Sequence, residues 1–418
     1  MRNQASPLLL AICCACPLLG SPASSAAEPA PSTKVEPPAV SKVEPELAPD
    51  KDLLASIAAL PDNTWLKLPP LKVTGDLDWL GPKDSIRQVG PRGRDYSNKA
   101  AWMPDRKRAI FAGGGHNVHP LNDVWEYDLA SNTWVCLYGA DAPAQGKPPE
   151  WMKDNLVIRD GALQTKRGGP PRLSHTFDGW SYDSDRRVAF MPESLRGAVF
   201  VDSKTVAEAL GAEEFAKWKP APFFLTFDPY ARKWGYVTEN APKCGRDPSA
   251  RYIAHLKSWW VSSGGSMGLY DPEKKATRVL STKGGGGGYG SSTAYDPDTR
   301  SVVVVVPPDK DGKAVTWVYS INTETWKTAQ PSAPTGGCSA SGYFDYDTRA
   351  KRCVLYTTRP NPGFWVYDVA ANEWTPVEIK GEPPAGGYVV GYYDPERDVL
   401  VHYNSKDVWV GRLKKAKQ

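Results

Sequence analysis

Residues 63–70 read NTWLKLPP, and residues 122–137 read NDVWEYDLASNTWVCL. Both contain the phrase NTW followed by apolar residues, but only the longer stretch places an aromatic segment and an Asp-containing turn in front of it. Asp at such a turn accepts local backbone N–H groups, so the longer stretch is typical of two strands joined as a hairpin. The shorter stretch therefore looks like the last strand of a repeated unit whose earlier strands are missing.

The hairpin recurs along the chain with identical internal spacing in its full copies. These copies are Trp125, Tyr127, Asp128 and Trp134; Trp317, Tyr319, Ser320 and Trp326; and Trp365, Tyr367, Asp368 and Trp374. Weaker copies have Phe227, Asp228 and Trp234, and Tyr270 and Asp271 with Thr277 in place of the tryptophan. Self-similarity with a period of about 40 to 50 residues is typical of β-propellers, in which each repeat is one four-stranded blade.

A second hairpin precedes each copy and consists of a strand, an Asp-rich turn and an apolar strand, such as the valine run of residues 302–306. The last such unit begins at Gly387, reaches Trp409 and has no fourth strand of its own. Residues 63–70 can supply that strand, which removes the free sheet edges. We therefore predict an all-β fold: a six-bladed β-propeller over residues 63–415, closed by an N-terminal strand that completes the C-terminal blade.

These residues resemble the kelch-repeat β-propeller family. The best match is residues 109–134, AIFAGGGHNVHPLNDVWEYDLASNTW, with a glycine run after the second strand, an aromatic third strand and a closing tryptophan. The chain is similar to the central domain of galactose oxidase, as a divergent member, since the di-glycine that ends the second strand recurs in only one other blade, at Gly264 and Gly265. The resemblance implies that ligands bind on one face of the ring, but the fold alone does not identify the ligand.

The N-terminal 27 residues are typical of a signal peptide, with Arg2 before an apolar run and small residues before a predicted cleavage after Ala27. Residues 28–50, rich in Pro, Glu and Ala, are predicted to be a linker, and residues 51–62 a short helical lead-in. We expect a periplasmic or secreted protein, with a lipid anchor at Cys16 as the less favoured alternative. The apolar run is too short for a membrane span.

Charge and composition narrow the class of protein. With 37 Gly, 39 Pro, 16 Trp and 19 Tyr, the chain is rich in turn formers and strand-forming aromatics. The formal net charge of +4 is small, and basic and acidic residues are interspersed, so we expect no nucleic-acid partner. Outside the signal peptide the cysteines are Cys136, Cys244, Cys338 and Cys353. Disulfide pairing and free thiols both stay open.

Two insertions interrupt the repeat, at residues 139–171 and 192–222. Within the second, residues 203–218, SKTVAEALGAEEFAKW, have helical periodicity. Both insertions extend loops that are predicted to lie on the face carrying His116 and His175, where we expect them to project. They could shape a ligand site there, or bind a protein partner.

The predicted site lies on the loops that enter the innermost strands and on those joining second to third strands. These loops are rich in Gly, which permits close backbone approach, and in Arg, whose planar fork suits carboxylate or sulfate. The predicted ligand-binding residues are Arg92, Arg94, Tyr96, His116, His119, Arg172, Arg251, Tyr252, Tyr289 and Arg359. The tyrosines are included because their rings could stack on a sugar, although packing is their commoner role.

Four of the five histidines are predicted to share this face: His116, His119, His175 and His255. A metal site built from them is the weaker hypothesis, since their spacing matches no recognised ligand pattern, and no cofactor is expected. His175 and His255 are the candidate general bases if the protein is an enzyme. The preferred interpretation is an exported propeller that binds a saccharide or other anionic ligand. A mutarotase-like or lyase-like enzyme acting on a sugar acid, or a protein-interaction scaffold, stays open.

Overall fold

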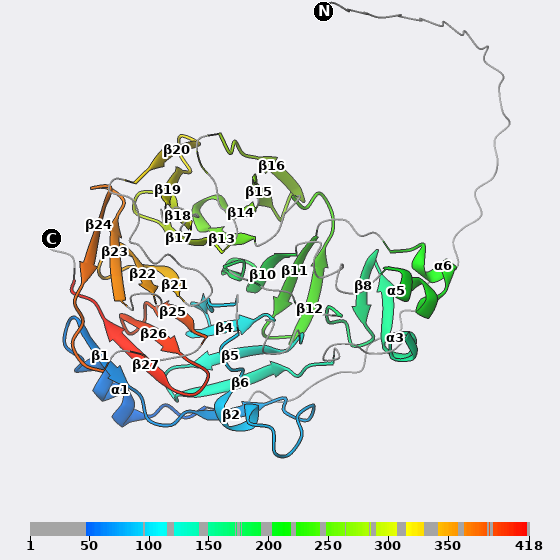
Figure 1. Ribbon diagram of the computed structural model, residues 1–418, viewed down its shortest axis with the longest axis horizontal. Helices are drawn as coiled ribbons and strands as arrows, with labels where there is room; N and C mark the ends of the chain where they lie inside the picture. Colours follow the sequence, from blue (N-terminus) through cyan, green and yellow to red (C-terminus); the bar gives the residue numbers. More distant parts are fainter. Residues whose placement is uncertain are drawn as a thin grey trace, which may run out of the picture. The chain divides into compact units, whose positions relative to one another are not determined.

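Four-stranded or five-stranded sheets form the six blades of the protein (Figure 1). The computed structural model describes residues 47–94, 97–114, 121–141, 149–171, 173, 176, 178–193, 203–218, 223–242, 248–263, 265–283, 285, 290–306, 315–329, 342–357, 363–382, 384 and 388–415. All of them belong to one structural unit, Val43–Gln418, whereas a second unit, Met1–Lys42, lies outside the described residues.

Five blades follow one another along the chain, and within each of them the strands run in chain order from the innermost outward. Blade 1 has β3 (Ala101–Met103), β4 (Arg108–Ala112), β5 (Val124–Asp128) and β6 (Thr133–Tyr138). Blade 2 has β9 (Ser181–Asp183), β10 (Val188–Glu193), β11 (Phe223–Asp228) and β12 (Lys233–Val237). Blade 3 has β13 (Ser249–Ile253), the 3-10 helix η1 (Ala254–Leu256), β14 (Ser258–Ser263), β15 (Ser266–Asp271) and β16 (Ala276–Val279). Blade 4 has β17 (Ser292–Asp296), β18 (Ser301–Val306), β19 (Val315–Ser320) and β20 (Thr325–Thr328), and blade 5 has β21 (Tyr343–Asp347), β22 (Arg352–Thr357), β23 (Gly363–Asp368) and β24 (Glu373–Val377).

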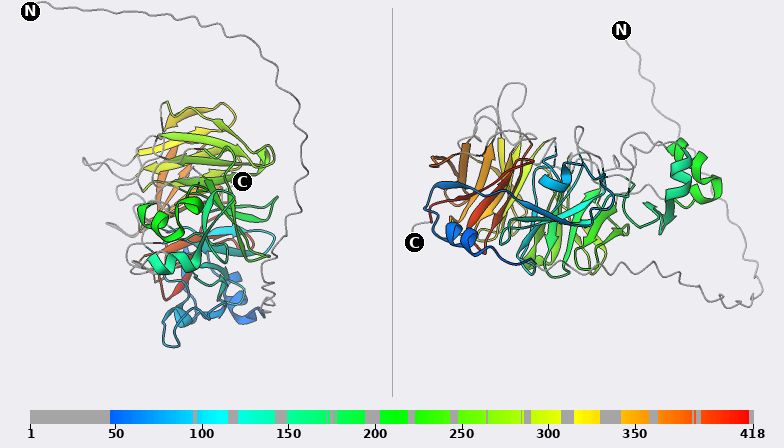
Figure 2. Two further views of the ribbon diagram at one scale, coloured as in Figure 1. Left: turned by 90° about the vertical axis from the view of Figure 1, so that its right-hand side faces the viewer. Right: turned by 90° about the horizontal axis from the view of Figure 1, so that it is seen from below.

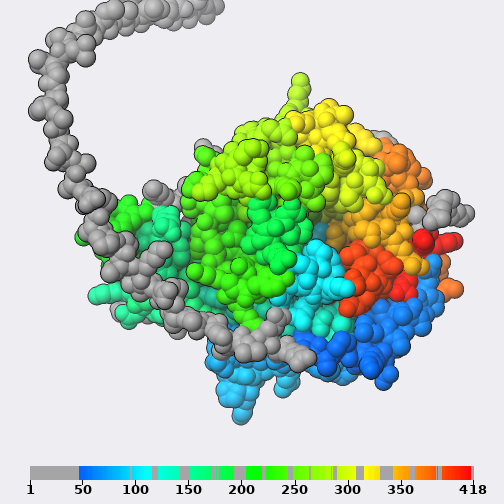
Figure 3. Space-filling view, turned by 180° about the vertical axis from the view of Figure 1, so that it is seen from behind, coloured from blue at the N-terminus to red at the C-terminus, as the bar shows by residue number. Residues whose placement is uncertain are grey.

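The sixth blade, which we name the closing blade, joins the two ends of the described chain. It consists of β25 (Val390–Asp394), β26 (Val399–Tyr403), β27 (Val408–Arg412) and, outermost, β1 (Thr64–Lys67). The last two strands are antiparallel, with Trp65 opposite Gly411 and Lys67 opposite Trp409. Figure 3 shows these N-terminal and C-terminal segments side by side in blue and red. The predicted all-β propeller, closed by its N-terminal strand, is confirmed.

The innermost strands contact one another in a closed cycle, β3 to β9, β13, β17, β21, β25 and back to β3. Because the cycle includes β25 of the closing blade, the ring has no gap between its first and last blades. No terminal blade is therefore left with an uncovered face, as it would be in a linear array of sheets.

Carboxylate-capped turns explain why the hairpins form where they do. Asp183 Oδ1 accepts the N–H groups of Asp185 and Arg186, and Arg187 then takes a left-handed φ of 56°. The same carboxylate-to-backbone cap occurs at Asp228, Asp271, Asp296, Asp347, Asp368 and Asp394. The repeat therefore fixes the register of each hairpin locally.

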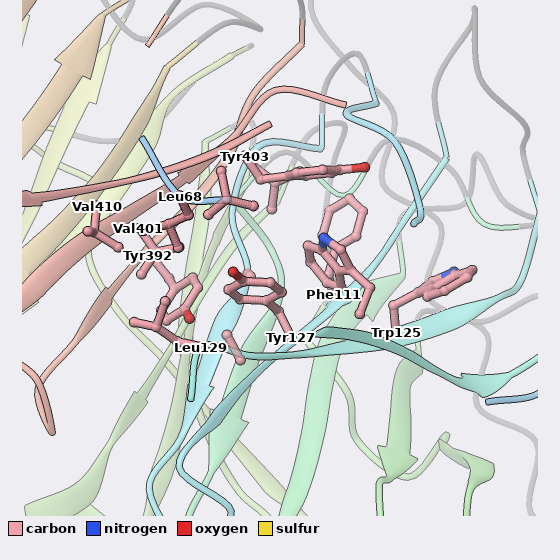
Figure 4. Packing of buried hydrophobic residues seen from close by; sticks show 14 of the residues in the cluster. Leu68, Phe111, Trp125, Tyr127, Leu129, Tyr392, Val401, Tyr403 and Val410 are labelled. Atoms are coloured by element: carbon pink, nitrogen blue, oxygen red, sulfur yellow. The ribbon is translucent and has the colours of Figure 1, made fainter. Parts of the chain in front are cut away.

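Aromatic side chains fill the interfaces between the blades. Tyr127 and Trp134, on neighbouring strands of blade 1, have ring centroids 5.0 Å apart, and Trp134 also packs on Tyr403 of the closing blade. Figure 4 shows Phe111, Tyr127 and Tyr403 within this cluster. In blade 1 the tryptophans of the repeated phrase, Trp125 and Trp134, are thus buried, and this removes a large apolar area from water.

The segment before blade 1 covers the outside of the ring. It begins with α1 (Lys51–Ala58), which Asp50 caps through the N–H of Leu53 and which buries Leu53 and Ile57. β2 (Lys72–Gly75) then pairs in parallel with β6 as a fifth strand of blade 1, and α2 (Ile86–Val89) follows. The sequence did not predict β2 or α2.

The two insertions fold together into one small module beside blade 2, at the periphery of the ring in Figure 1 and in the right-hand view of Figure 2. It contains α3 (Pro149–Asn155), β7 (Leu156–Arg159), β8 (Ala162–Thr165), α5 (Ser203–Leu210) and α6 (Ala212–Phe215). Its own apolar core is formed by Leu156, Ile158, Leu163 and Val206. Asp141 anchors the module to blade 1 by accepting hydrogen bonds from Tyr138 and Thr165. Across the described ranges, no helix is both long enough and apolar enough to cross a membrane.

Candidate functional site

The candidate site lies on the face where chain segments enter the innermost strands and where second strands connect to third strands; we name it the entering face. The opposite face, which carries the capped hairpin turns, is the turn face. The segment before β3 is fixed on the entering face by the closing blade. The N–H of Arg92 donates to Tyr403 Oη at 3.0 Å, and the N–H of Gly93 donates to Ser405 Oγ at 2.7 Å.

Two unusual backbone conformations meet at this point. Arg92 has a φ of 58° and Ser405 a φ of 81°, and neither lies in one of the carboxylate-capped turns. A left-handed conformation is uncommon for residues with a side chain and persists only where surrounding contacts impose it. Arg92 is held by the hydrogen bonds that its own N–H and that of Gly93 donate to Tyr403 and Ser405, and Ser405 lies in a turn in which Asn404 Oδ1 accepts the N–H groups of Lys406 and Asp407.

The Arg92 side chain is half-buried, and its guanidinium has no hydrogen bond or ion pair among the residues described. Lys406, next to Ser405, is exposed, and within the same described ranges its ammonium group has no ion pair either. This part of the entering face therefore carries two unneutralised positive charges on a fixed backbone.

Arg94 has a different role. It is completely buried and donates to Asp123 Oδ2 at 2.5 Å and to the carbonyl oxygen of Gly113. Asp123 Oδ2 also accepts from Trp125 Nε1 at 2.6 Å. Arg94 therefore joins the segment that enters blade 1 to the loop between its second and third strands. The hydrogen-bond donors of its guanidinium are used within the protein.

Arg251, near the axis of the ring, also makes its side-chain hydrogen bonds within the protein. It is 6% exposed and donates to Asp178 Oδ2 and to the backbone carbonyl of Thr293. The N–H of Thr293 also donates to Asp178 Oδ2, at 2.5 Å. These bonds join blade 3, the segment entering blade 2, and blade 4.

Lys99 completes this axial cluster and was not predicted. Its ammonium donates to the carbonyl oxygen of Phe344 at 2.9 Å and to Asp345 Oδ1 at 3.1 Å, and Asp345 Oδ2 accepts the N–H of Tyr393 at 3.2 Å. Burial lowers the pKa of Lys99, and the nearby Arg251 lowers it further. The bonds of Lys99 and Asp345 join blade 1, blade 5 and the closing blade, and those of Arg251 and Asp178 join blades 2, 3 and 4. The signal in the sequence was a lysine two residues before the first inner strand.

The placement of His255 on the entering face was wrong. β13 begins at Ser249, so Arg251 and Tyr252 lie within the strand and His255 falls in η1, on the turn face. There His255 Nδ1 and Tyr295 Oη are hydrogen-bonded at 2.9 Å. Partial burial lowers the pKa of His255, with a smaller contribution from the positive charge of Arg300.

Tyr252 also belongs structurally to the turn face. Burial raises the pKa of Tyr252, and the nearby charges of Asp183 and Asp185, in the first turn of blade 2, raise it further. Stacking of this ring on a sugar at the entering face does not fit that orientation.

The remaining predicted residues lie outside the described residues: Tyr96, His116, His119, Arg172, His175, Tyr289 and Arg359. The same holds for Cys244 and Cys338. Cys136 and Cys353 are buried free thiols whose pKa values burial raises well above the ordinary range. Among the described residues no group of three or more His, Cys, Asp or Glu side chains could hold a metal ion.

Sheet order, ring closure and the entering face together define a six-bladed β-propeller. The Kelch motif family matches residues 107–137, the second to fourth strands of blade 1. The protein is a divergent propeller of the kelch type, as predicted.

Two solved structures align with the chain at low sequence identity and low TM-score. An auxiliary nutrient binding protein from Bacteroides thetaiotaomicron aligns with a TM-score of 0.47 at 10% identity, over 83% of this chain and 76% of that chain. An oligogalacturonate lyase from Vibrio parahaemolyticus aligns with a TM-score of 0.40 at 11% identity, over 84% of this chain and 96% of that chain. No curated protein matches the sequence. These likenesses concern the fold alone.

Proposed function

We propose that this protein is an exported kelch-type propeller that binds a saccharide or other anionic ligand on its entering face. The observation that carries the proposal is Arg92: a strained backbone, fixed by two hydrogen bonds from the closing blade, presents a guanidinium without a partner among the described residues. Strain of this kind costs free energy and is concentrated at functional sites.

The chemistry of the site favours an anion. A guanidinium is always charged and offers a planar fork that matches carboxylate or sulfate in two parallel hydrogen bonds. Lys406 adds a second positive charge close by along the rim. The site is also rigid, because Arg94, Arg251 and Lys99 tie the entering segments into the ring. Preorganisation lowers the entropy cost of binding, so such a rim suits a binding protein.

The enzyme alternative is weakened on one point. Of the two candidate bases, His255 lies on the turn face, away from the segments that carry Arg92. The preferred function is therefore binding.

The test compares two arginines in similar backbone conformations on opposite faces. Arg92 and Arg232 have φ values of 58° and 53°, but Arg232 lies in a capped turn on the turn face. We expect the exported chain to bind acidic glycans on an array. By titration calorimetry, Arg92→Gln should weaken binding about 10-fold to 100-fold, because a charge-assisted hydrogen bond contributes roughly 1.5–3 kcal/mol. Arg232→Gln should bind like the wild type. Failure of the wild type to bind any acidic glycan, or equal binding by both variants, would contradict the proposal.

A further inference from the structure

Blade 3 lacks two bulky side chains that the other blades have. At the second position of the fourth strand the other blades carry a tryptophan: Trp65, Trp134, Trp234, Trp326 and Trp374. Blade 3 has Thr277 at this position. On the neighbouring third strand the other blades carry a large side chain, namely Trp125, Leu225, Trp317, Trp365 and Trp409, whereas blade 3 has Gly268. Two bulky side chains are thus missing from one region of one sheet.

An apolar groove of about 310 Å³ lies in that region. Its lining includes Pro242, Val261, Met267, Gly268, Thr277 and Val279. Gly268 is directly opposite Val279 in the strand pairing, and Thr277 projects from the same side of β16 as Val279. The groove is therefore the space that aromatic side chains occupy in the equivalent part of other blades.

Blade 4 shows how that space is used when the tryptophan is present. Trp326 packs its ring on Tyr319, with centroids 5.0 Å apart, and its Nε1 donates to the carbonyl oxygen of Ser281, in the connection from blade 3, at 3.0 Å. In blade 3, Thr277 Oγ1 instead donates to the carbonyl oxygen of Asn240, in the connection from blade 2. The connection that an indole would contact is present, and its Pro242 forms part of the groove wall.

The strand beside the groove is also available for pairing. Three of the four residues of β16 are exposed, and Val279 is 82% exposed, more than any other large apolar residue in the described part of the chain. The fold already contains a strand added to a blade in this manner, since β2 pairs along the outer edge of β6 and places Val73 against the core. An exposed strand edge next to a side-chain pocket is the arrangement that binds extended peptides.

We propose that this groove binds an aromatic side chain, indole above all, carried on an extended segment of a partner protein that lies along β16. The segment adds to blade 3 as β2 adds to blade 1, and its aromatic ring fills the space that the missing tryptophan leaves. The site is on the outer rim of blade 3, so it is independent of ligand binding at Arg92.

The test uses N-acetyl-L-tryptophanamide, which carries the indole between two peptide groups, and N-acetyl-L-leucinamide as the matched probe. Val261 lines the groove and lies opposite Gly268 in the strand pairing, so its labelled methyl groups report occupancy by NMR through the ring current of a bound indole. We expect a saturable shift of the Val261 resonances, assigned by their loss in Val261→Ile, and at least tenfold weaker binding of the leucine probe.

Two tryptophan substitutions at adjacent residues test whether the effect comes from filling the groove. One places the new ring in the groove, and the other places it on the opposite side of the strand. Thr277→Trp restores the repeat, so it should raise the melting temperature and abolish the Val261 shift. Arg278→Trp places the ring on the other side of β16, where Arg278 pairs with Glu324, and should leave binding unchanged. Val279→Lys changes an exposed residue and should weaken binding without loss of folding. An unsaturable wild-type response, or binding that persists in Thr277→Trp, would overturn the proposal.

Discussion

At the scale of single residues, hydroxyl groups on the inner strands join neighbouring blades. Tyr182 Oη donates to Asp105 at 3.0 Å, and Tyr346 Oη donates to Asp298 at 3.1 Å; in each case the acceptor lies in the first turn of the preceding blade. The Tyr295–His255 bond occupies the same place in the repeat. His255 is thus a structural substitute for an aspartate, which explains why a histidine occurs on the turn face.

These bonds can be measured by a double-mutant cycle. Tyr346→Phe and Asp298→Asn should show a coupling energy of about 0.5–1 kcal/mol in the free energy of unfolding, because one hydrogen bond to a partly exposed carboxylate is lost. The control is the exposed pair of Lys351 and Asp298, 3.9 Å apart, for which Lys351→Met should show a coupling of roughly 0–0.5 kcal/mol. Equal couplings in the two denaturant-unfolding cycles would mean that the tyrosine bond has no special role.

His402 should make folding sensitive to acid. It is fully buried among aromatic rings, with Tyr356 at 4.7 Å and Trp409 at 5.8 Å between centroids, and neither ring nitrogen has a hydrogen-bond partner among the described residues. Burial lowers the pKa of His402 from 6.5 to about 3. Because the unfolded chain takes up this proton below about pH 6.5 and the folded chain does not, the stabilisation is complete above pH 6.5 and is lost as the pH falls toward 3.

The expected loss between pH 7 and pH 4.5 is about 3 kcal/mol in the free energy of unfolding, from two pKa units of difference. His402→Leu should remove this dependence. Asp347, whose pKa burial raises to about 6, acts in the opposite direction, but its effect is common to both chains and cancels in their difference. Urea unfolding of both chains at pH 7, 5.5 and 4.5 measures that difference, and parallel pH profiles would refute the assignment to His402.

At the scale of strands and helices, the sequence predicted those elements that are specified by residues close together in the chain. Strand alternation and the aspartate turns identified all six blades, including the weak blade 3, because each hairpin is specified by residues close in sequence. β2 was missed because it pairs in parallel with β6 and no hairpin precedes it. The roles of Arg94 and Arg251 were also missed, since their carboxylate partners, Asp123 and Asp178, are 29 and 73 residues away.

Trp65 is the side chain that should matter most in the closing strand. It is 5% exposed and packs on Phe364 of blade 5, with ring centroids 4.9 Å apart. Trp65→Ala should cost about 3–5 kcal/mol in the free energy of unfolding, as for other buried aromatic truncations. Trp326→Ala, at a half-buried position of blade 4, should cost less. A smaller loss for Trp65→Ala than for Trp326→Ala, measured by chemical denaturation, would show that the closing strand contributes little.

At the scale of the whole molecule, ring closure depends on contacts between residues that are almost the full chain apart, such as Trp65 and Gly411. Bringing such distant segments together has an entropy cost, and the strand pairing and the burial of Trp65 must offset it. A chain that starts at residue 68 keeps every other strand of the ring but leaves the edge of β27 unpaired. We expect it to have a lower melting temperature and rapid amide exchange in β27.

A synthetic peptide of residues 60–70 should restore that protection when added in trans, because the missing strand is continuous and its docking site is formed by the rest of the ring. The same peptide with Trp65→Ala should restore less, since it keeps the backbone pairing but not the buried indole. Hydrogen exchange of β27 with each peptide separates the two contributions. Unchanged stability of the shortened chain would mean that the ring closes without its N-terminal strand, and the entering face would then need another explanation for the fixed position of Arg92.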